Sequence, residues 1–268
     1  MRETAPAKLN LALHVRGREA DGYHRIETVF AFVEYGDELS VAPGDGLTLT
    51  VTGPFAGALE GEGDNLVLRA ARALAAAAGV AANAALTLDK RLPVASGIGG
   101  GSADAAAALR LLRRFWRLDK GDERLAEIAG MLGADVPACL AGRTMRGEGR
   151  GDRLTPLDLP NLAGTPVLLV NPRVAVPTAA VYRGWDGVDR GPLIDWDAER
   201  NDLEPPARAI APVIGDVLAA LGGARIARMS GSGATCFGLF ESEQARDAAA
   251  AGIAAAHPDW WVLPTRLR

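Results

Sequence analysis

The sequence predicts an α+β fold, in which short strands and helices alternate along the chain. Apolar and polar side chains alternate strictly over residues 7–15, which indicates a half-buried strand. A glycine-rich loop over residues 93–101 runs directly into an alanine-rich stretch that favours a helix. A second glycine-rich turn, residues 230–233, separates two short apolar stretches that are typical of strands. Together these patterns favour a small-scale α+β sandwich.

Length and composition set the class of protein. The chain has 268 residues, of which 49% are hydrophobic, enough for one large domain or two modest ones. The net charge of −4 argues against a general binder of nucleic acid or of anionic membranes. We find no apolar run of about 20 residues and no signal-peptide pattern. Two distant cysteines and three scattered histidines suggest a reduced, cytoplasmic protein without a metal cluster.

The first predicted strand carries two polar candidates on one face. Leucines fill the other face of residues 7–15, whereas Lys8 and Asn10 share the opposite face and could serve a site. The alternative for Lys8 is a solvated lysine at a sheet edge. A turn at residues 20–24 leads to further strands at residues 26–33, 39–42 and 47–52, so the chain opens as a β meander.

The next helix is predicted from an N-cap at Asp64 or Asn65 to residue 78, where Gly79 ends it. A strand at residues 84–88 follows, and Lys90 adds positive charge between that strand and the glycine loop. The loop contains Gly97, Gly99, Gly100 and Gly101 directly before the helix. Free amides at a helix N-terminus bind anions, usually phosphate. The alternative is a flexible linker or a packing loop.

The loop differs from the familiar phosphate loops. A Walker loop ends in Gly-Lys-Ser/Thr, but here Ser102 follows Gly101 and the loop contains no lysine. A Rossmann fingerprint needs a third glycine at position 102, where this chain has Ser102. It also needs a strand that runs straight into the loop, but Pro93 separates the loop from the preceding strand. A protein-kinase loop continues into a strand rather than a helix. What remains is a proline-led, lysine-free loop that caps a helix.

Beyond the loop the strand and helix patterns continue. A helix over residues 123–132 precedes Asp135, a single carboxylate among apolar neighbours, for which a helix N-cap is the alternative to a functional role. Residues 144–162 lose their periodicity, so we place a domain boundary there, with domains at 1–152 and 153–268. The remaining predicted elements are strands at 167–170, 225–229, 235–240 and 260–263 and helices at 178–183, 206–221 and 242–256.

Seven separated segments together resemble the GHMP kinase superfamily, which includes galactokinase and mevalonate kinase. The Asp-Gly-Tyr-His turn and the long Gly-Ile-Gly-Gly-Gly-Ser loop favour one branch, the 4-diphosphocytidyl-2-C-methyl-D-erythritol kinases of non-mevalonate isoprenoid (terpenoid) biosynthesis. The segments, in the order of the family, are residues 7–11, 21–24, 64–66, 97–102, 133–137, 201–205 and 229–234.

The resemblance implies an N-terminal ATP-binding α+β domain and a ferredoxin-like C-terminal α+β domain, with the active site in the cleft between them. It also implies ATP as phosphoryl donor, with Mg²⁺ carried by the nucleotide phosphates and Ser102 as a candidate ligand. The residues expected at ATP are Asn65, Lys90, Pro93, Val94, Ala95, Ser96, Gly97, Ile98, Gly99, Gly100, Gly101, Ser102, Ala103 and Asp104. Two of these depart from the family pattern, since Ile98 replaces a leucine and Ala103 replaces a frequent second serine.

The implied reaction moves the γ-phosphoryl group of ATP onto the 2-hydroxyl of 4-diphosphocytidyl-2-C-methyl-D-erythritol. That hydroxyl is tertiary and hindered, so positioning matters more than the strength of the nucleophile. The resemblance assigns Asp135 to accept the hydroxyl proton and Lys8 to attract the charge on the phosphoryl oxygens.

The cytosine base of this substrate needs an aromatic face and hydrogen-bonding groups. Tyr23 and His24 follow the strand of Lys8, and Tyr182 lies in a segment where the family also has an aromatic residue. Thr178 and Asn10 could contact the diphosphate or the polyol. The alternatives are a turn tyrosine packed on the sheet for Tyr23 and a core ring for Tyr182.

Two other functions stay open at this point. One is a different GHMP kinase, acting on homoserine, mevalonate or a sugar. The other is a non-catalytic module that binds phosphorylated ligands, which would leave Lys8 and Asp135 unexplained. The expected partners are small molecules only, with no nucleic acid and no membrane, and the expected state is a monomer or a weak homodimer.

Overall fold

The computed structural model describes residues 1–60, 64–119 and 121–268. These residues form two compact units that interleave along the chain. Unit 1 comprises Met1–Ala7, Gly36–Val94 and Gly99–Gly142, and unit 2 comprises Lys8–Tyr35, Ala95–Ile98 and Arg143–Arg268. Strands β1 (Arg2–Arg18) and β2 (His24–Ala42) pair with each other and contribute residues to both units. The boundary between residues 152 and 153 stays a prediction.

Unit 1 places helices beside a short run of strands. Strand β4 (Ala84–Asp89) pairs antiparallel with the second half of β2 and parallel with β3 (Leu47–Thr52). A parallel pair needs a crossover connection, which the segment with η1 (Ala56–Leu59) and α1 (Leu66–Ala78) supplies. The other helices of the unit are α2 (Gly100–Phe115), α3 (Asp122–Leu132) and α4 (Val136–Ala141).

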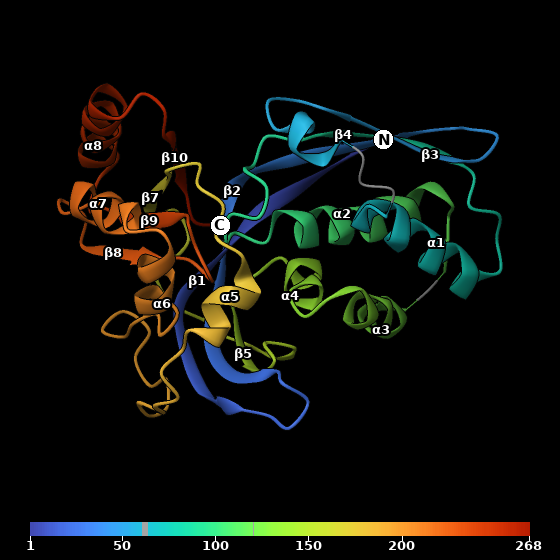
Figure 1. Cartoon of the computed structure of the whole chain (residues 1–268). Helices are drawn as coiled ribbons and strands as arrows, with labels where there is room; N and C mark the ends of the chain where they lie inside the picture. The colour runs from blue at the N-terminus through green and yellow to red at the C-terminus, as the bar shows by residue number, and fades with distance from the viewer. Residues whose placement is uncertain (61–63, 120) are drawn as a thin grey trace. The chain divides into compact units, whose positions relative to one another are not determined.

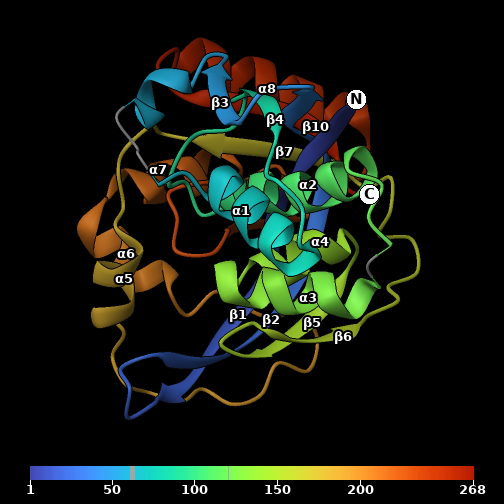
Figure 2. The ribbon, with the colours of Figure 1, turned by 90° about the vertical axis from the view of Figure 1, so that its right-hand side faces the viewer.

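Helices α1 and α2 lie side by side, as Figure 2 shows. The side chain of Asn65 caps α1 by accepting a hydrogen bond from the Val67 amide at 2.9 Å, and Gly79 ends the helix in the left-handed conformation, as predicted. Alanines dominate the buried faces, with Ala70 and Ala71 on α1 and residues 105–108 on α2. Small side chains let the two helices approach closely, so the alanine tracts serve packing.

Unit 2 contains a four-stranded antiparallel sheet of order β10-β7-β9-β8. Helix α7 packs on β8 and β9, and α8 packs on β7 and β10 (Figure 1). The strands are β7 (Pro166–Asn171), β8 (Ile226–Met229), β9 (Cys236–Leu239) and β10 (Trp261–Arg266); the helices are α5 (Thr178–Arg183), α6 (Glu204–Ile210), α7 (Val213–Ala220) and α8 (Glu243–Ala256). The core of this unit includes Leu13, Leu168, Val170, Ile214 and Phe240.

Three local predictions were wrong. Strand β2 is continuous from His24 to Ala42, where the sequence indicated two strands. The helix predicted over residues 206–221 is two helices, because Pro212 lacks the amide that a continuous helix needs at that position. The aperiodic stretch 144–162 contains a hairpin of β5 (Met145–Gly149) and β6 (Arg153–Pro156), with β5 paired to the first half of β2. The predicted α+β class is confirmed, and no described helix is long and apolar enough to span a membrane.

The Asn-Asp-Leu segment at residues 201–203 ties unit 2 together. The buried Asn201 amide donates to the carbonyls of Met229 and Gly231, both at 2.8 Å, and its oxygen accepts from the Leu203 amide. The buried Asp202 carboxylate accepts from the Val15 amide at 2.9 Å. This segment therefore holds the second glycine turn against β1, which is a structural role.

Candidate active site

Lys8 lies in the buried part of β1, within unit 2. Its side chain is 3% exposed, and Nζ donates to Oδ1 of Asn10 at 2.9 Å and lies 5.3 Å from the centre of the Phe30 ring. A solvated edge lysine is therefore the wrong interpretation. Residues two apart in a strand share a face, which is why Lys8 and Asn10 meet.

Asn10 is held in turn by Thr28 on β2. The Asn10 Nδ2 donates to Thr28 Oγ1 at 2.8 Å, and that hydroxyl donates to the Ala12 carbonyl at 2.6 Å. All three side chains are buried. Because Nδ2 must face a hydroxyl that itself points at a carbonyl, Oδ1 is directed at Lys8. Thr28, Asn10 and Lys8 form a hydrogen-bonded row, which we call the Lys8 row.

The Lys8 row continues into the glycine loop. The Lys8 amide donates to the Ile98 carbonyl at 2.9 Å, and the Asn10 amide donates to Ser230 Oγ at 3.1 Å. Ser230 Oγ donates to the Gly97 carbonyl at 3.0 Å. Residues 95–98 of the loop are thus fastened to β1 and to the second glycine turn, all within unit 2.

Gly97 is required where the loop meets the second glycine turn. Its φ is +79°, and a Cβ there would collide with the Ser230 carbonyl and with the backbone of Gly233, 2.8 Å away. The Thr235 amide also donates to the Ser96 carbonyl at 3.1 Å. The motif at residues 229–234 therefore fixes the path of this part of the loop.

In unit 1 the loop ends in a helix N-terminus that suits a phosphate. Helix α2 begins after Gly99, whose φ is +65°, and no side chain caps it. Gly101 is exposed, and a Cβ there would meet only Leu66, at 3.6 Å. Uncapped amides at the positive end of a long helix are the donors that an anion needs. The local geometry thus fits ATP phosphates.

The remaining loop residues differ in exposure. Pro93, Ile98 and Ala103 are buried, Val94 and Ser102 are half-buried, and Ala95 is exposed with a φ of +51°. A Cβ on Gly100 would lie 3.1 Å from Lys90 Nζ, so packing alone already favours glycine at this position.

Lys90 and Asp104, both predicted at ATP, instead contact each other in the interior of unit 1. Lys90 Nζ donates to Asp37 at 2.5 Å and to Asp104 at 2.7 Å, and all three side chains are at most 4% exposed. Asp37 also accepts from the Arg91 and Leu92 amides. The cluster fixes the segment before the loop; a role at ATP for either residue stays a prediction.

Two carboxylates share one ammonium in this cluster. Burial, reinforced by the charge of Asp37, raises the pKa of Asp104 to about 8 although Lys90 opposes the shift. Burial lowers the pKa of Lys90, but the charges of Asp104 and Asp37 outweigh it and raise that pKa overall. Asp104 Oδ1 has no hydrogen-bond partner among the described residues, whereas Asp37 has two backbone amides. We therefore assign the proton to Asp104.

Asp135 stands at the N-terminus of α4 in unit 1. It occupies the N-cap position, yet its side chain makes no capping hydrogen bond. Pro137 sits in the first turn, where the missing amide is tolerated. Asp135 therefore has the position that the N-cap alternative predicts, but its side chain does not make the capping hydrogen bond. Lys8 and Asp135 belong to different units, and their joint action is a proposal.

The aromatic candidates of the Asp-Gly-Tyr-His turn differ in their surroundings. Tyr23 is 56% exposed, and the Arg150 guanidinium lies 3.9 Å from its ring centre. Arg150 also bonds the Asp21 carboxylate. The alternative of a turn tyrosine packed on the sheet is therefore wrong.

His24 and Tyr182 come together in unit 2. Their ring centres lie 5.0 Å apart, with planes inclined by 37°. Trp185, which the sequence reasoning did not select, places its ring centre 5.7 Å from that of His24 at 86°. Tyr182 is partly buried and packs against the core of unit 2, so its role at the base stays a prediction beside the core-ring alternative. Thr178 shares a hydrogen bond of 2.8 Å with Ser232.

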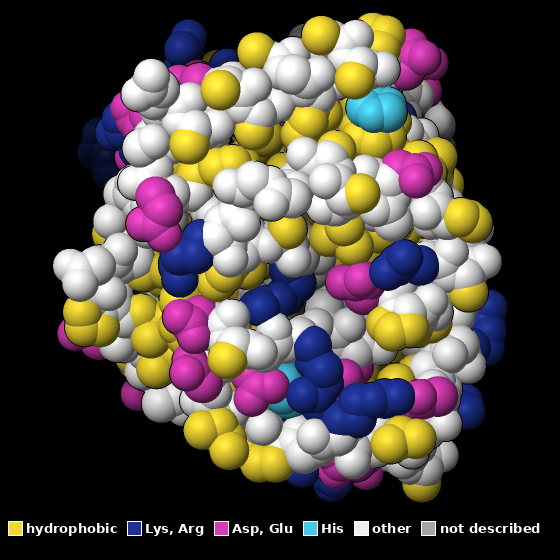
Figure 3. Space-filling view, turned by 90° about the vertical axis from the view of Figure 1, so that its left-hand side faces the viewer, with side chains coloured by type: hydrophobic (Ala, Val, Ile, Leu, Met, Phe, Trp, Pro, Cys, Tyr) yellow, Lys and Arg dark blue, Asp and Glu magenta, His cyan; other side chains and the backbone are white. Residues whose placement is uncertain are grey.

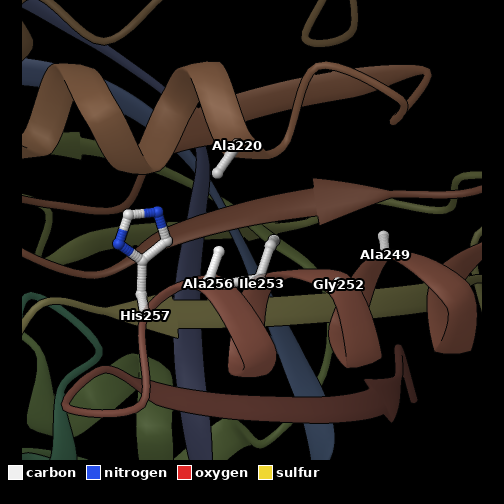
Figure 4. A pocket seen from close by; sticks show the side chains of 6 residues that line it. All are labelled: Ala220, Ala249, Gly252, Ile253, Ala256 and His257. Carbon is white, nitrogen blue, oxygen red and sulfur yellow. The ribbon is translucent and has the colours of Figure 1, made fainter.

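Two further observations concern metal binding and a cavity of unit 2. Among residues 1–60, 64–119 and 121–268, no group of three or more His, Cys, Asp or Glu side chains could hold a metal ion. A cavity of about 300 Å³ between α7 and α8 is lined by three alanines, Gly252, Ile253 and His257, of which His257 is the titratable group (Figure 4). Hydrophobic side chains also mark the surface of this side of the molecule (Figure 3). The lining of the cavity does not offer the charges that phosphoryl transfer needs.

Comparisons with known proteins agree with this geometry. The model of the GHMP kinases N-terminal domain matches residues 65–143, and the model of the C-terminal domain matches residues 188–259. The 4-diphosphocytidyl-2-C-methyl-D-erythritol kinase of Rhizorhabdus wittichii is 59% identical, over 99% of this chain and 94% of its own. This chain belongs to the 4-diphosphocytidyl-2-C-methyl-D-erythritol kinase family. The enzyme of that name from Sphingopyxis alaskensis is 52% identical over 100% and 99% of the two chains.

Solved structures of this family and its relatives share the fold. A crystal structure of 4-(cytidine 5'-diphospho)-2C-methyl-D-erythritol kinase aligns with a TM-score of 0.85 at 36% identity, covering 100% of this chain and 99% of that one. The mevalonate kinase of Methanococcus jannaschii aligns over 100% and 98% with a TM-score of 0.73 but only 10% identity, which indicates a common fold alone. The protein is therefore an ATP-dependent phosphotransferase of the GHMP kinases.

Sequence reasoning missed several residues that contact the predicted site residues. Thr28 stands in a predicted strand of mainly apolar residues, and a buried hydroxyl there is a weak signal for a hydrogen-bonding role. Asp37 and Trp185 carry no motif of their own. Ser230 was quoted within a motif but was not selected, although it joins β1 to the glycine loop.

The raised pKa of Asp104 predicts a pH-dependent stability. The folded state keeps this proton up to about pH 8, whereas the ordinary carboxyl releases it near 3.8. The stabilisation is therefore complete below the lower value and is lost as pH rises through the higher one. We expect Asp104→Asn to remove this loss, so that the variant gains stability relative to wild type from about pH 4 to 8. Urea denaturation over this pH range measures the difference.

The exposed Asp45→Asn is the matched control, because it removes a carboxylate from the same unit without touching the cluster. Its free energy of unfolding should follow the wild-type pH profile. A profile of Asp104→Asn parallel to that of wild type would contradict the assignment of the proton.

Proposed function

We propose that this protein transfers the γ-phosphoryl group of ATP to the 2-hydroxyl of 4-diphosphocytidyl-2-C-methyl-D-erythritol, giving ADP and the 2-phosphate. The observation that carries the proposal is the 59% identity to a kinase of that name over 99% of the chain. The seven segments that resemble the family are present in the sequence. The hydrogen bonds of the Lys8 row also hold a cationic group in a fixed position.

In the proposed reaction the substrate oxygen forms a bond to the γ-phosphorus. The bond between that phosphorus and the bridging oxygen of ATP breaks, and its electron pair leaves with ADP. The hydroxyl proton passes to a carboxylate. In such a loose transition state an enzyme acts mainly by alignment and by neutralising charge.

We assign the proton acceptor to Asp135. A carboxylate can accept the proton late in the transfer, when the attacking oxygen has already become acidic. The Asp135 side chain does not cap α4, so the amides of that helix do not occupy its carboxylate. The motif Gly-Ala-Asp-Val-Pro at residues 133–137 supports the assignment through its match to the family.

We assign the neutralising cation to Lys8. The charge is buried in a low-dielectric setting, where it acts more strongly on phosphoryl oxygens than a solvated lysine would. Its hydrogen bond to the Asn10 amide fixes its position without cancelling its charge. Asn10 therefore acts on Lys8, and its direct contact with the diphosphate or the polyol is a prediction.

We assign the triphosphate to the glycine loop and the start of α2. The uncapped amides after Gly99 and the exposed Gly101 support this assignment. Mg²⁺ would ride on the phosphates and neutralise their charge, and Ser102, half-buried in the first turn, is the nearby hydroxyl that could ligate it. Ala103 is buried and adds no hydroxyl.

We assign the cytosine base to the aromatic residues of unit 2. His24 and Tyr182 already contact each other, and Tyr23 presents an exposed ring whose other neighbour is Arg150. Base stacking on aromatic side chains is worth about 1–3 kcal/mol per base. The hydroxyl pair of Thr178 and Ser232 is available for the diphosphate or the polyol.

The proposal is tested by the release of ADP with defined acceptors. The protein should consume ATP with 4-diphosphocytidyl-2-C-methyl-D-erythritol and not with mevalonate, homoserine or galactose. Turnover of one of these other acceptors would assign the protein to a different kinase of the superfamily. Binding of a cytidine compound without ATP consumption would identify a non-catalytic module.

The catalytic assignments predict the effects of two substitutions. We expect Asp135→Asn to lower kcat by about 10²-fold or more, because it removes the proton acceptor while keeping the shape. Lys8→Met should lower kcat by a similar factor, about 10²–10³-fold, because charge on the phosphoryl oxygens is no longer neutralised. In both variants KM should change much less. Steady-state kinetics of the double variant should show little further loss.

The exposed Asp158→Asn serves as control for the loss of a carboxylate. Melting temperatures verify that each variant is folded. Near wild-type turnover of Asp135→Asn would return this residue to a role at the helix terminus. Strictly multiplicative losses in the double variant would mean that the two residues act independently.

A further inference from the structure

Trp185 meets the His24 ring from the end of α5. The Trp185 and His24 ring centres are 5.7 Å apart and their planes are nearly perpendicular, at 86°. Tyr182 approaches the same imidazole at 5.0 Å with a tilt of 37°. Edge-to-face and tilted arrangements at these separations are the favoured geometries of aromatic pairs. The His24 imidazole is thus bounded by two rings of different orientation.

The backbone fixes Trp185 at this point. The Trp185 amide donates to the Tyr182 carbonyl at 3.3 Å, and the Gly184 amide donates to Ala180 and Val181 at 3.0 Å. A Cβ on Gly184 would lie 3.0 Å from Pro206, so a larger residue would disturb the turn. Tyr182 and Trp185 therefore reach His24 from one tight turn at the end of α5.

A packing role alone does not explain a tryptophan at position 185. Its indole Nε1 is buried and has no hydrogen-bond partner among the described residues. An unpaired buried donor is destabilising, and an apolar side chain such as Leu would avoid that cost. The ring is only partly buried against the core of unit 2. The contact with His24 gives a reason for an aromatic residue here.

We propose that Trp185 is a positioning residue that fixes the plane of the His24 imidazole and thereby the selectivity of the acceptor site for cytosine. The inference rests on the proposed function, in which His24 contacts the base. The direction of the imidazole nitrogens follows from the plane of the ring, and a hydrogen bond weakens steeply when misaligned. A base edge can be distinguished only if that direction is fixed.

The charge state of His24 suits this task. Burial, together with the nearby charge of Arg18, lowers the pKa of His24. The imidazole is therefore neutral at pH 7, with one nitrogen that donates and one that accepts. Cytosine presents an amino donor beside a ring-nitrogen acceptor, whereas uracil presents a carbonyl and an N–H there. A neutral imidazole of fixed orientation can discriminate between these two edges.

The test compares Trp185→Leu, Trp185→Met and Trp185→Phe. The first two remove the ring but keep an apolar side chain, and the third retains a ring. Trp196→Leu is the matched control, because Trp196 is also half-buried and lies further along the same connection. The measurements are kcat and KM for 4-diphosphocytidyl-2-C-methyl-D-erythritol and for its uridine analogue, KM for ATP, and the NMR titration of His24. His24→Asn identifies the His24 resonance among the three histidines.

We expect Trp185→Leu and Trp185→Met to raise KM for the cytidine substrate about 2- to 10-fold, the range that aromatic pair energies imply. Selectivity over the uridine analogue should fall by a similar factor, while kcat and KM for ATP stay within about twofold. The pKa of His24 should rise toward its ordinary value. Trp185→Phe should restore most of the selectivity, and Trp196→Leu should behave as wild type.

Unchanged selectivity and an unchanged His24 titration in folded Trp185→Leu and Trp185→Met would overturn the inference while leaving the proposed function intact. An equal loss with Trp196→Leu would also overturn it, since the effect would then be one of general packing. If wild-type protein does not turn over the cytidine substrate, both the proposed function and the inference fail.

Discussion

The hydrogen bond between the Lys8 ammonium and the Asn10 amide is the contact on which the rest of the candidate site depends. A buried charge is strongly destabilising unless polar groups surround it. Asn10 supplies one such group, and Thr28 holds Asn10 in the orientation that presents its oxygen. The backbone amide of Asn10 donates to the Ser230 hydroxyl, which in turn donates to the Gly97 carbonyl. Asn10 therefore takes part in both arrangements: its side chain holds the ammonium, and its backbone amide holds Ser230, which contacts the glycine loop.

Lys8 and Lys90, both buried among the residues that the structure describes, differ in their surroundings. Lys90 donates to the Asp37 carboxylate and to the protonated Asp104, and the charge of Asp37 neutralises the ammonium inside the protein. Lys8 donates instead to the neutral side-chain amide of Asn10 in the Lys8 row, and this contact orients its ammonium. An oriented cation can stabilise the charge that develops on phosphoryl oxygens. The Lys8 motif and its place in the Lys8 row support Lys8 as the residue proposed to act on the phosphoryl group.

Much of the fold and part of the site could be predicted from the sequence. Alternation placed Lys8 and Asn10 on one face of β1, and helix caps at Asn65 and Gly79 fixed the ends of α1. Family motifs then pointed to segments that are distant in the sequence. The predictions failed where structure depends on tertiary pairing. Strands β5 and β6 are rich in glycine and arginine and are strands because β2 pairs with β5.

The missed site residues have a common cause. Thr28 and Trp185 matter because of the side chains that folding brings beside them, and no local pattern in the sequence records those neighbours. Lys90 illustrates the converse, since its charge suggested a phosphate site whereas its ammonium is bonded to Asp37 and Asp104. Residue type and spacing therefore indicate chemistry, but contacts decide which residue performs it.

The central claim is that the Lys8 row holds the ammonium in the position that phosphoryl transfer requires. The most direct test is single-turnover phosphoryl transfer by Thr28→Val, which keeps the shape of the side chain but removes the hydroxyl that orients Asn10, with Thr28→Ser as control. We predict that the rate falls at least about 10-fold in Thr28→Val, with ATP still bound and the fold retained, because a misplaced catalytic group loses alignment. Thr28→Ser should keep most of the rate. A wild-type rate in folded Thr28→Val would contradict the account.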